Sequence, residues 1–217
     1  MTLGEIVSTL AFIAEREGKA KKLTISDLNR LFKLVDYDFI RENFGHPDQP
    51  TGYETQGQIS EALLPIKTEA TVTLTSGVGT IPNDFYHFVD SYYTSGASTI
   101  RISEVRSQES VAFRSSSINA PTTTYPIIEV WETQVKVYPT TGISSIKFVY
   151  LKRPTPAVYA VKTENGIQVY DSASSTQFEW TADKHIDIIR LLLKYIGISL
   201  GNLQIAEYVN QKEAVEN

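Results

Sequence analysis

The chain of 217 residues contains no cysteine. A disulfide framework, a thiolate nucleophile and a zinc site with cysteine ligands are therefore excluded. The protein is compatible with a reducing compartment, and cysteine-based redox chemistry has no residue to use.

Long apolar runs are also lacking. The most apolar window, residues 186–200, is shorter than the ~20 residues that a bilayer requires, and it contains Asp187, Arg190 and Lys194. The first fourteen residues include Glu5 and have neither a leading basic region nor a small-residue cleavage pattern. We therefore expect no membrane span and no signal peptide, and we expect a soluble protein made in the cytoplasm.

Basic residues are fewer than acidic ones: the chain has 20 lysines and arginines and 25 aspartates and glutamates, which gives a net charge of −5. This sign disfavours a protein that grips phosphate backbones. It is consistent with a protein that lets DNA pass, because an acidic wall repels the polymer. The 41% hydrophobic and 21% charged residues are ordinary for a folded globular chain.

The beginning of the chain has a helical pattern. Thr2 and Glu5 have the spacing of a capping box, and apolar residues follow at helical intervals over 3–16. Thr24 or Ser26 can cap a second amphipathic helix. These signals predict an N-terminal α-hairpin.

The end of the chain is helical as well. Thr181 can cap a helix with a wide apolar face, and a further helix is expected from Asn202. The region between the two ends has a composition rich in Pro, Gly, Gln and Thr at its start, which indicates an arm. The predicted organisation is a helical part over 1–47 and 181–217, a connecting arm over 48–66, and a β platform over 67–180 with a short helix near 107–115.

Inside the predicted platform the hydrophobic period changes to two. Ala70, Val72 and Leu74 alternate with threonines before two turn glycines, which predicts a β-hairpin. Residues 125–159 form the clearest β region, with tight turns between short strands. Asn165-Gly166 is a further hairpin signal because both residues tolerate positive φ. The fold class is therefore predicted to be α+β, with the N-terminal α-hairpin and the C-terminal helices packed together beside a central antiparallel platform.

Candidate chemistry is sparse. Asp183, His185 and Asp187 cluster at a helix start, but His185 at i+2 points away from the face shared by the two aspartates. No serine lies in a Gly-x-Ser-x-Gly motif, and Gly77-Val78-Gly79 lacks the third glycine and the lysine of a phosphate-binding loop. We therefore expect no catalytic residue, no metal ligand and no cofactor, and a protein that is not an enzyme.

Aromatic residues are abundant, with twelve tyrosines and two tryptophans. Most of the tyrosines fall in the β region, where they have high strand propensity and where they are also enriched at protein interfaces. We favour core and interface roles for them. The alternative is a carbohydrate- or receptor-binding module that stacks sugars on exposed aromatic rings.

Several stretches together carry a resemblance to a known group of proteins. They are Tyr125-Pro126-Ile127-Ile128, Val135-Lys136-Val137-Tyr138-Pro139, the run from Phe148 to Pro154, Phe178-Glu179-Trp180, the run from Asp183 to Ile189, and Ile196-Gly197-Ile198. In these stretches the chain resembles ring or adaptor structural proteins of crAss-like and other Bacteroidetes-infecting podoviruses. The order of helices around an antiparallel platform is similar to the tail tubular, or gatekeeper, proteins of short-tailed phages.

The resemblance covers roughly residues 60–210 and implies a virion structural protein. Such a protein would form a homo-oligomeric ring, usually of about twelve copies, in the head-to-tail connector. It would extend the DNA channel below the portal and contact the portal and other ring, tail or muzzle proteins, with DNA as a partner only by passage through the lumen. No catalytic residue exists to carry over.

A ring subunit needs contacts on both flanks because a heterologous interface must close on itself. The two long polar loops and the C-terminal tail are the candidates for these contacts, on the basis of their length and composition. The residues that we expect at the interface are Asp48, Thr51, Tyr53, Ser116, Asn119, Thr123, Tyr208 and Gln211.

Overall fold

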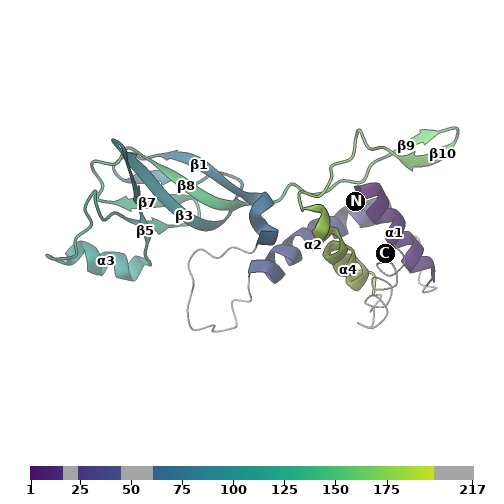
Figure 1. Cartoon of the computed structure of the whole chain (residues 1–217), viewed down its shortest axis with the longest axis horizontal. Coiled ribbons are helices and arrows are strands. Elements are labelled where there is room, and N and C mark those ends of the chain that lie inside the picture. Colours follow the sequence, from purple (N-terminus) through teal and green to yellow (C-terminus); the bar gives the residue numbers. More distant parts are fainter. Residues whose placement is uncertain (17–23, 45–60, 198–217) are drawn as a thin grey trace, which may run out of the picture. The chain divides into compact units, whose positions relative to one another are not determined.

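The computed structural model describes residues 1–16, 24–44 and 61–197 (Figure 1). These residues form two compact units: a helical unit of residues 1–16, 24–44, 61–65 and 154–197, and a β unit of residues 66–153. Helices and mostly antiparallel sheets make up the two units, which confirms the predicted α+β class.

Within the described residues, the helical unit contains three α-helices, two 3-10 helices and a two-stranded ribbon. Its elements are α1 (Leu3–Arg16), α2 (Ile25–Phe44), η1 (Glu61–Ile66, which runs one residue into the β unit), β9 (Val161–Glu164), β10 (Ile167–Tyr170), η2 (Ala182–Lys184) and α4 (His185–Tyr195). The helix α4 contacts both α1 and α2, as predicted for the N-terminal hairpin and the C-terminal helix. The further helix expected from Asn202 lies outside the described residues.

The starts of α1 and α2 follow from their capping residues. The backbone N–H of Glu5 donates to Oγ1 of Thr2 at 3.3 Å, and the N–H of Thr2 donates to Oε2 of Glu5 at 2.8 Å, which confirms the predicted capping box. At α2 the N–H of Asp27 donates to Oγ1 of Thr24 at 3.2 Å. Thr24 is therefore the residue that caps this helix.

Residues 154–180 belong to the helical unit, so the predicted extent of the β platform is too long. The reason lies in specific contacts. The ring of Tyr159 stacks on that of Tyr170 at 5.0 Å, and the N–H of Tyr159 donates to Oδ1 of Asn29 in α2 at 2.7 Å. The predicted Asn165-Gly166 turn does join β9 and β10, with φ angles of 52° and 81°.

The β unit is a sandwich of two four-stranded sheets. The first has the order β1 (Lys67–Thr73), β8 (Ser145–Lys152), β3 (Phe85–Ser95) and β4 (Ser98–Arg101), and the second has the order β2 (Val78–Thr80), β7 (Gln134–Tyr138), β6 (Ile127–Val130) and β5 (Ser103–Glu104). Side chains from both sheets, including Val72, Phe148, Ile128 and Val137, form a single buried cluster. The apolar alternation seen in the sequence is therefore the inner face of each sheet.

Two strand pairings differ from the prediction. The strands β1 and β2 do not pair as a hairpin, because β1 pairs with β8 and β2 pairs with β7. The tight turn between them, closed by the Thr75 and Val78 backbones at 2.8 and 3.0 Å, carries the chain from one sheet to the other. The pair β5 and β6 is parallel, so the platform is not wholly antiparallel. The predicted hairpin of β6 and β7 is confirmed.

The helix α3 (Ser107–Ser115; Figure 1) spans the residues where the sequence predicts a short helix. It contacts β6. Its C-cap is Ser116, and an irregular segment then runs to β6. This part of the β unit contains the described members of the predicted interface.

Candidate assembly surface

The acidic cluster at the start of α4 does not gather into one site. Asp183 forms an ion pair with Nζ of Lys184 at 3.2 Å, and Asp187 forms one with the guanidinium of Arg190 at 3.8 Å. His185 is buried, with Nε2 3.2 Å from the carbonyl oxygen of Trp180. Among residues 1–16, 24–44 and 61–197, no group of three His, Cys, Asp or Glu side chains is placed to hold a metal ion.

A partly open hollow of about 310 Å³ lies in the β unit. Its lining is mainly hydroxyl-bearing, from Thr71, Thr94, Ser95, Ser144 and Ser145, with Tyr93 and Lys147. The ammonium of Lys147 is paired with Glu69 at 3.2 Å, and the hydroxyl of Tyr92 donates to the same carboxylate at 2.6 Å. The charges around the hollow are therefore satisfied by one another.

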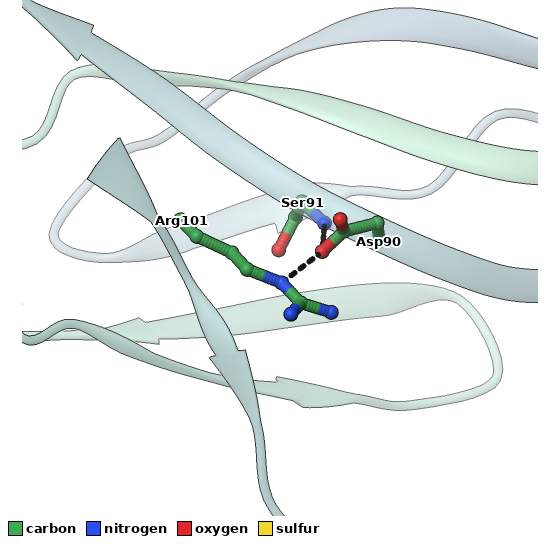
Figure 2. A network of polar contacts seen from close by, with 3 residues as sticks. All are labelled: Asp90, Ser91 and Arg101. Atoms are coloured by element: carbon green, nitrogen blue, oxygen red, sulfur yellow. Dashed lines mark hydrogen bonds and ion pairs between the residues drawn. The ribbon is translucent and has the colours of Figure 1, made fainter. Parts of the chain in front are cut away.

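A second polar network joins β3 to β4. Figure 2 shows Oδ1 of Asp90 accepting from Nε of Arg101 at 3.0 Å and from the N–H of Ser91 at 2.8 Å. The register of β3 against β8 shifts between Phe88 and Asp90, which is the mark of a β-bulge. The network therefore holds the short strand β4 against an irregular part of β3.

The helix α3 is fastened to the second sheet by a buried carboxylate. Glu129 of β6 is 4% exposed. The hydroxyl of Ser110 in α3 donates to its Oε1, and the indole Nε1 of Trp131 donates to its Oε2 at 3.1 Å. The guanidinium of Arg114 lies over the ring of Tyr138 at 4.6 Å. Side-chain contacts at both the middle and the end of α3 thus fix it on the sheet.

Large apolar side chains project from α3 and from the segment that follows it. They are Val111, Phe113, Ile118 and Tyr125, which we call the α3 surface. Ile118 is 90% exposed and Tyr125 is 78% exposed. The four side chains lie within residues 111–125 of the sequence, and exposed apolar side chains are the kind of group that a partner would cover.

The segment that carries Ile118 and Tyr125 is shaped by its own hydrogen bonds. The Oγ of Ser116 accepts from the N–H groups of Ile118 at 3.2 Å and Asn119 at 3.0 Å. The carbonyl oxygen of Thr123 accepts from the hydroxyl of Tyr93. These bonds hold the exposed side chains in a defined backbone, which lowers the entropy lost when a partner covers them.

Three of the predicted interface residues, Ser116, Asn119 and Thr123, therefore lie in the segment that carries the α3 surface. The other five, Asp48, Thr51, Tyr53, Tyr208 and Gln211, lie outside the described residues. The predicted interface residues in this segment are polar, whereas the side chains that the structure shows exposed there include the apolar Ile118 and Tyr125. The sequence signal for an exposed apolar side chain here is Ile118, which stands between Ser117 and Asn119 in a mainly polar loop.

No protein-family model matches the chain, and no curated protein is significantly similar to it. None of the helices in the described part of the chain is both long and apolar enough to cross a membrane.

Proposed function

We propose that this chain is a virion structural protein that forms a homo-oligomeric ring in the head-to-tail connector of a short-tailed phage. The α3 surface is the observation that supports the proposal most directly. The sequence resemblance to ring and adaptor proteins supports it independently. In this proposal the ring extends the DNA channel below the portal and contacts the portal and neighbouring tail proteins.

The energetics of the α3 surface favour its burial against a partner. Transfer of one large apolar side chain out of water contributes about 1.5–3 kcal/mol. Ile118 and Tyr125 therefore offer several kcal/mol to any subunit contact that covers them, and α3 is already fixed to its sheet by Ser110 and Glu129. A contact repeated head to tail around about twelve subunits closes into a ring when its rotation divides a full turn.

The charge of the chain fits the same proposal. A net charge of −5 is consistent with a channel wall that repels the DNA backbone and so lets it pass. The proposed partners are other copies of the chain, the portal and adjacent ring, tail or muzzle proteins. The proposed function requires no cofactor and no catalytic step.

The test is a pair of matched substitutions. Ile118→Asp places a charge in the α3 surface, whereas Ile167→Asp places the same charge at a 67% exposed isoleucine in β10. We expect both variants to fold with wild-type circular dichroism. Electron microscopy of particles complemented with each variant should show rings with Ile167→Asp and no rings with Ile118→Asp. Rings of wild-type abundance with Ile118→Asp would refute the role of this surface.

The alternative, a glycan-binding module, has weaker support. It requires an exposed aromatic platform, but one face of the Trp131 ring, which is 44% exposed, carries the ammonium of Lys136 at 4.4 Å, and its indole donates to Glu129. Among the aromatic residues in the described part of the chain, Tyr125 has the most exposed side chain, so it is the residue on which a sugar would stack. Binding of the purified chain to a glycan array that is lost in Tyr125→Ala, with ring assembly retained, would favour the module.

A further inference from the structure

A carboxyl group is buried where α2 meets the segment that leads into α4. Asp36 of α2 is 2% exposed. Its Oδ1 accepts from the indole Nε1 of Trp180 at 2.7 Å, and its Oδ2 has no hydrogen-bond partner among residues 1–16, 24–44 and 61–197. A carboxylate buried with one oxygen unpartnered is strongly disfavoured relative to the neutral acid.

The surroundings of this carboxyl are mainly aromatic. The ring of Trp180 lies 4.7 Å from that of Phe39, and Phe178 meets Phe32 at 5.3 Å. The residues Phe32, Asp36 and Phe39 follow one another at helical spacing, so they share a face of α2. Phe178 and Trp180 therefore fasten the chain before α4 to this face, and Asp36 is the polar group in the contact.

Charged and titratable groups near Asp36 do not supply a cation for it. Burial, together with the charge of Glu179, raises the pKa of Asp36 to about 7, against the hydrogen bonds from Trp180 and the Ala157 backbone. On α4, His185 contacts the Trp180 carbonyl oxygen. The remaining groups between α2 and α4 pair elsewhere: Arg190 with Glu42 and with Asp187, and the Tyr195 hydroxyl with Asp38.

We propose that Asp36 and Trp180 form a proton-controlled clamp, which holds the start of α4 against α2 most firmly when the Asp36 carboxyl is neutral. Ionisation places an unpaired negative charge in an aromatic contact, and the clamp weakens. The Trp180 indole reports the change directly because its N–H bonds to the carboxyl that titrates.

The direction of the pH effect follows from the two states of Asp36. The folded chain keeps the proton up to about pH 7, whereas the unfolded chain loses it near the ordinary pKa of 3.8. The contribution of Asp36 to stability is therefore complete below pH 3.8, declines as the pH rises to about 7, and changes no further above that value. His185 acts in the opposite direction, because burial and the amino group of Met1 lower its pKa.

The indole N–H signals of the two tryptophans test the clamp in the intact chain. Trp131→Phe assigns them, and the Trp180 signal is followed by ¹H–¹⁵N NMR from about pH 5 to about pH 8.5, a range that separates the expected midpoint from that of an ordinary aspartate. We expect the Trp180 signal to titrate with a midpoint near pH 7. A signal that stays constant over this range would overturn the proposal.

Two variants separate Asp36 from the other groups. Asp36→Asn keeps an acceptor oxygen for Trp180 and removes the ionisation, so the titration should disappear. His185→Gln should retain it, and loss of the titration in this variant alone would assign the effect to His185 and refute the clamp. The urea midpoint of the transition reported by Trp180 should fall with rising pH in the wild type and should fall less in Asp36→Asn.

Discussion

The attachment of α3 makes a quantitative prediction through Ser110. This serine is fully buried, and its hydroxyl donates to Oε1 of Glu129. Ser110→Ala removes this donor. The buried carboxyl group of Glu129 then keeps the hydrogen bond that the indole of Trp131 donates to its Oε2. The substitution removes one oxygen atom, so it leaves little empty volume and the lost hydrogen bond dominates its effect.

A hydrogen bond to a charged group contributes about 1.5–3 kcal/mol. Because a tenfold change in an equilibrium constant corresponds to about 1.4 kcal/mol, detachment of α3 should become roughly ten- to a hundredfold more frequent. With a slope of about 2 kcal/mol per molar urea, the unfolding midpoint of the β unit should fall by about 1 M. Amide exchange in α3 should accelerate by the same factor as its detachment.

Ser115→Ala is the matched control, because Ser115 lies in the same helix and is exposed. An exposed substitution of this kind changes stability by less than about 0.5 kcal/mol. Urea unfolding followed by the fluorescence of Trp131 and hydrogen exchange of α3 would measure both variants. Equal midpoints and equal exchange rates for Ser110→Ala and Ser115→Ala would refute the account of how α3 is held.

Three further predictions concern the two folded units. Gly79→Ala should lower the free energy of unfolding by about 1–3 kcal/mol through overpacking, because an added Cβ would lie 2.4 Å from Cγ1 of Val72; a wild-type urea midpoint would contradict the packing of the sheets. Gly96→Ala should cost about 1 kcal/mol through its positive φ alone, since nothing lies within 4 Å of its Cβ position; a loss as large as that of Gly79→Ala would be unexpected. Thr24→Ala should destabilise the helical unit by about 1 kcal/mol, because it removes the acceptor for the Asp27 N–H. Thermal melting followed by circular dichroism at 222 nm measures the loss, and an unchanged melting temperature would contradict the role of this cap.

Local signals in the sequence predicted local structure well. The capping box of Thr2 and Glu5 placed the start of α1, and the pair Asn165-Gly166 placed the β9–β10 turn. Both depend on interactions between residues close in the chain, which short-range patterns describe. The α+β class followed from the change of hydrophobic period along the chain.

Pairings between distant strands could not be read in the same way. The alternation in residues 70–74 shows that β1 has a buried face, but it does not show whether the partner is β2 or β8. The domain boundary was misplaced for a similar reason. The stacking of Tyr159 on Tyr170 and the bond to Asn29 depend on the folded helical unit, and no local pattern reveals them.

Buried polar groups were the other features that the sequence did not reveal. Asp36 and Glu129 are acidic residues within amphipathic patterns, where solvent exposure is the usual outcome. Their burial depends on Trp180 in the first case and on Ser110 and Trp131 in the second. The loop that follows α3 was predicted as an interface from its length and composition, whereas the exposure of its apolar side chains is visible only in the structure.

The central claim is that copies of this chain associate through the α3 surface into a closed ring. Electron microscopy of virus particles that contain the protein, with symmetry averaging about the tail axis, tests it most directly. The account predicts a ring of about twelve copies coaxial with the portal, with Ile118 and Tyr125 covered by a neighbouring copy. Monomers or trimers on the outer surface of the particle, with Ile118 and Tyr125 facing solvent, would contradict it.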